Sequence, residues 1–215
     1  MEKQSTRTEG IALLIGCFLM FITMVMHPTG GSLVYILEIW HLVVGSHALA
    51  LASIPFLGLG FYGLHLRLRE SGFLSKLAFS IMLTGLVAVM IAGAINGLAY
   101  PIYASMYEGA SESALASLEI VTRFGFALNH AFDYIFMASA CVATLFFSVA
   151  ILQTRALPPW LGYAGLLLGV AAVALWIGGI VSVDLHGFRV FIFGWVLWVA
   201  AAGFSMWMTR DRADG

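Results

Sequence analysis

Charge is scarce in this sequence. Lysine, arginine, aspartate and glutamate make up 10% of its 215 residues, whereas soluble domains contain about 25%. Hydrophobic residues make up 61%, and the formal net charge is −1, so no basic surface for nucleic acid is indicated. The composition excludes an ordinary soluble domain and predicts an integral membrane protein whose main partner is the lipid bilayer.

Cysteine and catalytic motifs are scarce as well. The two cysteines, Cys17 and Cys141, both lie within apolar runs, which indicates buried thiols rather than a disulfide framework. The sequence contains no phosphate-binding glycine loop with a lysine, no nucleophile elbow and no HExxH motif. These absences exclude the common nucleotide, protease and kinase signatures, and they leave open whether the protein is an enzyme.

What the sequence does contain is six long apolar runs. A membrane-spanning helix needs about 20 mainly apolar residues. We therefore expect an all-α, polytopic membrane protein with six transmembrane helices, forming a single domain over residues 1–215. The expected helices cover residues 11–26, 33–66, 74–100, 124–152, 160–183 and 188–208.

The second of these runs is too long for one straight span. Pro55 lies within it, and a proline inside a helix removes one backbone hydrogen bond and clashes with the preceding turn. We therefore expect this helix to bend near Pro55.

The distribution of lysine and arginine predicts the orientation. Six spans place both termini on one side of the membrane, and cytoplasmic loops carry an excess of these residues. Only Arg123 and Arg189 lie on the opposite side from the termini. The other eight are Lys3, Arg7, Arg67, Arg69, Lys76, Arg155, Arg210 and Arg212. We expect both termini to be cytoplasmic, in a multi-pass protein of the bacterial inner (plasma) membrane.

A faint internal repeat relates two parts of the chain. A shift of 83 residues aligns His47 with His130 and Ala48 with Ala131. The aligned segments are 33–100 and 124–183. They would form a parallel repeat of two hairpins, each presenting a histidine at a similar depth.

The ionisable residues gather mainly at the membrane face opposite the termini. A carboxylate in the hydrocarbon region costs roughly 2.5–3.5 kcal/mol, so Asp133 should have a partner. His130 and Asp133 share one helix face, and we expect both to point into the bundle and approach His41 or His47.

Three groups of candidate site residues follow. The candidate metal or haem ligands are His41, His47 and His130; Asp133, Glu38 and Asn96 are candidates for orienting these ligands or relaying protons; His27, His186 and Asp184 are weaker candidates.

The fourth helix carries a polar stripe. Its residues recur at spacings of three and four, which places them on one helix face. They are His130, Asp133, Met137, Cys141, Thr144 and Ser148. This is the least lipid-like face of the helix, and we expect it to look inward.

These residues support three interpretations. Neutral imidazole binds Zn, Cu and haem iron, so the first is a metal or haem b site for redox or metal-dependent chemistry, with a quinone as electron-transfer partner. The second is a transporter or small-molecule binder whose histidines and carboxylates carry protons. The third is a purely structural cluster in which Asp133 bonds His130 or Asn96 across helices. The oligomeric state is open, and a homo-oligomer is one alternative.

One stretch carries a resemblance to known families. Residues 157–169, with the sequence LPPWLGYAGLLLG, resemble the fourth loop and fifth helix of uncharacterised six-helix membrane-protein families of bacteria. The resemblance implies a six-helix membrane fold. It implies no established activity, and none of the histidines is carried over from it.

Overall fold

The chain folds into a bundle of long helices. The computed structural model describes residues 6–28, 33–179 and 185–209. Within these ranges all regular structure is helical and there is no β-strand. Six of the helices are long and apolar enough to cross a membrane, which confirms the all-α, six-span prediction for the described part of the chain.

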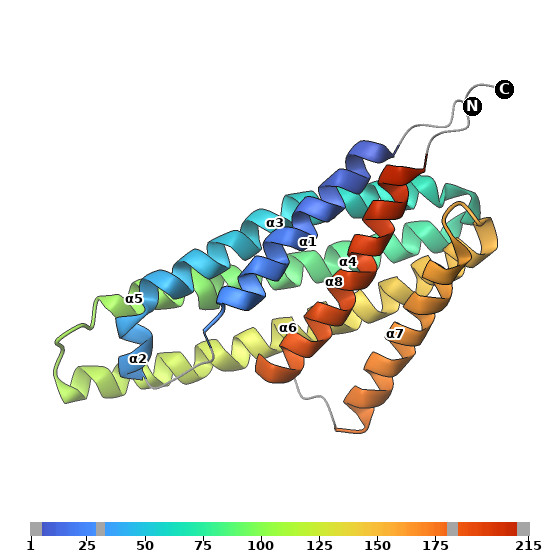
Figure 1. Ribbon diagram of the computed structural model, residues 1–215. Helices are drawn as coiled ribbons and strands as arrows, with labels where there is room; N and C mark the ends of the chain where they lie inside the picture. The colour runs from blue at the N-terminus through green and yellow to red at the C-terminus, as the bar shows by residue number, and fades with distance from the viewer. Residues whose placement is uncertain (1–5, 29–32, 180–184, 210–215) are drawn as a thin grey trace.

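The helices follow one another through short connections (Figure 1). The helix α4 continues without interruption through a π-helix, η2, into α5. The bounds are α1 Arg7–Met26, α2 Leu33–Glu38, α3 Trp40–Arg67, η1 Arg69–Ser71, α4 Phe73–Ala92, η2 Gly93–Ala99, α5 Tyr100–Ser105, α6 Glu112–Thr154, α7 Pro159–Ile177 and α8 Leu185–Met208.

The second apolar run is interrupted near its start, at Ile39 between α2 and α3. The helix α3 continues through Pro55, and the bend expected there stays a prediction. Freed backbone groups are costly in hydrocarbon but can be satisfied nearer water. A break near the end of the run is therefore cheaper than a break at its middle.

One part of the molecule, which we call the six-helix half, is closely packed. It comprises α1, α4, α7, α8, residues 47–67 of α3 and residues 134–154 of α6. Glycines let its helices approach closely: a Cβ added at Gly60 would lie 2.3 Å from Cγ of Leu13, and one at Gly10 would lie 2.7 Å from the carbonyl oxygen of Gly203. Phe61, Phe147 and Trp195 are stacked in its core and almost fully buried.

The rest of the molecule projects beyond the ends of α1, α7 and α8 (Figure 1). This projecting lobe comprises α2, η2, α5, residues 40–46 of α3 and residues 112–133 of α6. At a rise of 1.5 Å per residue, the 43 residues of α6 span about 64 Å, roughly twice the hydrocarbon thickness of a bilayer. Its core is small, consisting of Tyr100, Ala104 and Leu118 with partly buried neighbours.

Candidate functional site

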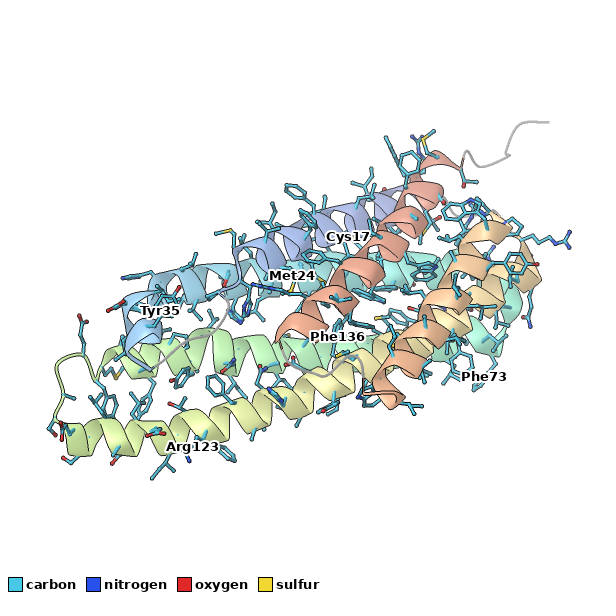
Figure 2. The ribbon with its side chains drawn as sticks, turned by 60° about the horizontal axis from the view of Figure 1, so that its bottom comes forward. Cys17, Met24, Tyr35, Phe73, Arg123 and Phe136 are labelled. Carbon is cyan, nitrogen blue, oxygen red and sulfur yellow. The ribbon has the colours of Figure 1, made fainter. Side chains whose placement is uncertain are left out.

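Two histidines and one arginine meet where the six-helix half joins the projecting lobe. His27 caps the end of α1, His47 lies on α3, and Arg189 lies in the second turn of α8. The rings of His27 and His47 are in edge contact, with centroids 4.8 Å apart. We call these three residues the junction site. Met24, which Figure 2 labels, lies one turn before His27 on α1.

Arg189 holds the end of α1 in place. Its guanidinium donates a hydrogen bond to the backbone carbonyl oxygen of His27, one of the helix-end carbonyls that lack a partner within their own helix. Its Nε is buried and has no hydrogen-bond partner in the described structure. The described ion pair of the molecule, Glu119 with Arg123, lies elsewhere, on the projecting part of α6. Arg189 therefore retains both charge and donor capacity at the junction.

The two histidines are anchored in the same way. Nδ1 of His27 lies 2.9 Å from the carbonyl oxygen of Pro28, and Nδ1 of His47 lies 2.8 Å from that of Val43. Because a carbonyl oxygen can only accept, Nδ1 carries the proton in each neutral ring. Each Nε2 is then left with its lone pair, able to accept a hydrogen bond, take up a proton or bind a metal.

Burial controls the protonation of His27, which lies just beyond the spanning part of α1. Burial lowers the pKa of its imidazole below the usual value of 6.5; the hydrogen bond to Pro28 raises the pKa and the nearby charge of Arg189 lowers it again. The net direction is downward. The ring is therefore held neutral at a pH where a solvated histidine would begin to take up a proton.

The π-helix η2 makes room for His47. A Cβ added at Gly97 would lie 2.0 Å from Cγ of the His47 ring, so a side chain at this position would displace the imidazole. One turn earlier, Gly93 packs against Leu51 of α3. A π-helix is rare, and short π segments are found often at functional sites.

Most of the residues singled out from the sequence do not reach this site. His41 is exposed, with its ring against Trp40, and Glu38 is exposed at the end of α2. Asn96 lies in η2, and its Oδ1 is buried without a hydrogen-bond partner among the described residues. Asp184 and the side chain of His186 lie outside the described residues.

The predicted pairing on the fourth helix is wrong in two respects. His130 is exposed rather than turned into the bundle, and no hydrogen bond or ring contact joins it to His41 or His47 in the described structure. Asp133 accepts a hydrogen bond from Nδ2 of Asn129 at 2.6 Å, instead of bonding His130 or Asn96. A residue four positions away on the same helix is its neighbour by geometry, so the carboxylate finds its partner locally. A role for His130 as a ligand stays a prediction.

The inner part of the predicted stripe is confirmed. Met137, Cys141, Thr144 and Ser148 are all buried, and Thr144 accepts a hydrogen bond from Nε1 of Trp195. The stripe turns inward only within the six-helix half, where neighbouring helices cover it.

The sequence reasoning missed Arg189 and Gly97 as parts of the site. A weak signal was present for Arg189, since the predicted topology places only two lysines or arginines on its side of the membrane. A signal for η2 could have been sought in Gly93 and Gly97, which are four residues apart.

The comparisons and a search for metal ligands add no assignment. Comparison of the chain with known protein families, curated proteins and solved structures finds no match. Among the described residues, no group of three or more histidine, cysteine, aspartate and glutamate side chains could hold a metal ion.

Proposed function

We propose that this protein binds a small molecule or ion at the junction site and moves protons with it, as a proton-coupled transporter or binding protein would. A single observation carries the proposal: two anchored imidazoles and a buried guanidinium Nε without a described partner converge from α1, α3 and α8. Buried polar atoms are normally hydrogen-bonded, and an unpaired one calls for an explanation such as a bound ligand.

The position of the site supports this proposal. His27 ends a helix of 20 residues, about the length needed to cross the hydrocarbon core, so the site lies at one end of the membrane span. Beyond it, the lobe contributes the glycines of η2 rather than bulky side chains. A ligand could reach the site from the membrane surface, and imidazole is the side chain best suited to exchange a proton near neutral pH.

A metal ion is the second candidate, and one observation favours it. A histidine that binds a metal usually donates its other ring nitrogen to a carbonyl or carboxylate, as Nδ1 does in both His27 and His47. Two imidazoles are fewer ligands than a structural or catalytic zinc site uses. A haem iron between these rings is less suited to the geometry, because they already touch each other edge to face.

Native mass spectrometry of the protein in lipid nanodiscs would test the proposal. We expect a small molecule to remain bound to the wild type and to be lost from His47→Ala. His130→Ala serves as the matched control, because it removes an exposed histidine and should keep the ligand. Elemental analysis and the absorption spectrum of the same sample would identify a metal or haem. A wild type without bound species, or the same species in both variants, would count against the junction site.

We further infer that both termini face the cytoplasm of a bacterium and that the junction site faces outward across the inner membrane. The start of α1 and the end of α8 lie together, since Gly10 packs against Gly203 and Trp207, and the cation distribution supports this orientation. A reporter that works only in the cytoplasm should be active when fused after Gly215, and one that works only in the periplasm should be inactive. Activity of a periplasmic reporter at that position would reverse the orientation.

A further inference from the structure

We propose that the ligand of the junction site is an anion with a phosphate or carboxylate group, and that it binds together with protons taken up by His27 and His47. This inference rests on the proposed function and narrows it to one chemical class. Two features of the site support it, the charge of Arg189 and the tautomers of the two histidines.

Arg189 supplies the positive charge. It makes no ion pair with a carboxylate in the described part of the chain, although its Nε is buried. A guanidinium offers five donors in a planar fork that matches the oxygens of phosphate and carboxylate. One of its Nη groups is used by the carbonyl of His27, which fixes the orientation of the fork and leaves donors for a ligand.

The histidines supply the proton dependence. In their neutral forms both present an Nε2 lone pair, because Nδ1 is bound to a carbonyl. A lone pair repels an anion, whereas an imidazolium donates from both nitrogens. An anion therefore binds well only when a proton from solvent is added to Nε2. For each proton taken up, one neutral ring becomes a cation, and the charge of the anion is offset.

Among the described residues, no other group around the rings supplies a competing carboxylate. The described charged group that faces His27 is Arg189, from α8, and each histidine faces the other. The part of η2 against His47 is Gly97, which cannot titrate. On α6, the carboxylate of Asp133 is bonded to Asn129. A bound anion would therefore be the group that stabilises the protonated rings of His27 and His47.

The anion could come from a lipid headgroup or from solution. The site lies at the end of α1, and the neighbouring side chains of Val25, Met26 and Val190 are apolar and exposed, as expected where lipid chains meet headgroups. The chemistry recognised is the same in both cases, and the experiment below separates them by supplying each source alone.

The test is thermal unfolding of the full chain in nanodiscs, titrated with sulfate or acetate. Both probes keep a constant charge between about pH 6 and pH 8, on either side of the usual histidine pKa. A ligand that binds only the folded state raises the melting temperature. In phosphatidylcholine nanodiscs we expect sulfate or acetate to bind more tightly as pH falls, by up to roughly tenfold per pH unit for each proton linked to binding. If a headgroup is the source, phosphatidylglycerol should give the same stabilisation without added salt.

The variants separate this effect from general salt effects. Arg189→Gln removes the positive charge and shortens the side chain, and the probe should bind roughly tenfold more weakly or not at all. Arg123→Gln is the matched control, since it removes an exposed arginine and should respond like the wild type. His47→Gln should weaken binding and reduce its pH dependence.

Five results would overturn the inference. One is an equal response of Arg189→Gln and the wild type. A second is binding of added Zn²⁺ that tightens as pH rises, because metal ligands must be deprotonated. A third is a much stronger response in Asp184→Asn than in the wild type, which would indicate that an internal carboxylate, rather than a ligand, pairs with Arg189. The fourth is a neutral species such as a quinone, retained by the wild type, lost from His47→Ala and unaffected by anions. That result would support ligand binding at the junction site but refute an anion as the ligand. The fifth is the absence of any bound species and of any response to the probes, which would refute both the proposed function and the anion.

Discussion

The six-helix half and the projecting lobe differ in how closely their backbones approach. In the six-helix half, an added Cβ at Gly10 or Gly60 would collide with a neighbouring helix, whereas at Gly45 and Gly125 in the lobe it would meet nothing within 4 Å. The exception in the lobe is Gly97, where the Cβ would meet the ring of His47. Close packing contributes dispersion attraction between the helices and makes them harder to displace. The junction site therefore has one side set by a tightly packed bundle and another set by a looser one.

The polar groups of the two regions differ as well. Buried hydroxyls in the six-helix half are mostly bonded, as Ser53 is to the carbonyl of Ala50 and Thr144 is by Trp195. Most charged groups of the lobe are exposed, as in the pair of Glu119 with Arg123, which Figure 2 labels; Asp133 is half-buried. Arg189 at the junction and Asn96 in η2 retain buried atoms without described partners, and so do three residues of the six-helix half, namely Thr6, Glu9 and Ser148. Polar capacity left over at a boundary is what a ligand-binding site requires.

The largest difference in stability should separate two glycine-to-alanine variants, one in each region. We expect Gly10→Ala to lower the free energy of unfolding by about 3 kcal/mol, because the Cβ would press on the backbone of α8 at Gly203 and Trp207. Gly125→Ala should raise it by up to about 1 kcal/mol, since alanine favours a helix more than glycine does. Thermal or denaturant unfolding in one detergent would compare them. Similar values for the two variants would contradict the difference in packing.

Gly97→Ala should have the next largest effect, at the junction itself. The methyl group would displace the ring of His47, and the cost should be about 1–3 kcal/mol. The same substitution should also release any ligand held at the junction site, which native mass spectrometry would detect. A stable variant that keeps its ligand would show that η2 does not determine the position of His47.

The junction should make stability depend on pH. His27, which faces His47 and Arg189, has a pKa lowered by burial, so as pH falls below about 6.5 the unfolded chain takes up a proton before the folded chain does. Stability should then rise with pH across this window and be lost as pH falls, by at most about 1.4 kcal/mol per pH unit for this group. His27→Gln should remove its share of the slope. An unchanged slope in this variant would place the titrating group elsewhere.

The smallest effect should come from His130→Ala. The side chain is exposed and has no described hydrogen bond, so we expect a change within about 0.5 kcal/mol. Parallel unfolding of His47→Ala, whose ring bonds Val43 and touches His27, should show a larger loss. Equal losses would mean that the exposed histidine has a partner in the assembled protein.

The sequence was sufficient for the coarse fold because a bilayer imposes a simple length and polarity rule on each helix. The same rule placed the buried stripe from Met137 to Ser148 on one face. It could not place His130 or Asp133, because a 3.6-residue period extends a stripe indefinitely, whereas burial stops where the covering helices end. It also could not anticipate that Asp133 would be bonded by Asn129.

The junction site was harder to predict for a related reason. Its contacts join the end of α1 to the start of α8, and His27 and Arg189 are 162 residues apart along the chain. Helix periodicity predicts which residues of one helix share a face, but it does not predict contacts between two helices that are distant in the sequence. The π-helix is equally hidden, since the choice between α and π turns depends on what packs against Gly93 and Gly97 rather than on hydropathy.

The seven residues of η2 also set the rotational phase of everything that follows them in this helix. Each residue of an α-helix turns the chain by 100°, and a π turn absorbs a residue that an α turn would not. Tyr100, at the start of α5, points toward α6 and shares a hydrogen bond of 2.8 Å with Thr122. Deleting the exposed Ala94 would convert the segment toward an ordinary α-helix and rotate Tyr100 away from Thr122. Inserting or deleting a residue in η2 should therefore lower stability more than most substitutions there, because it would rotate α5 relative to α6.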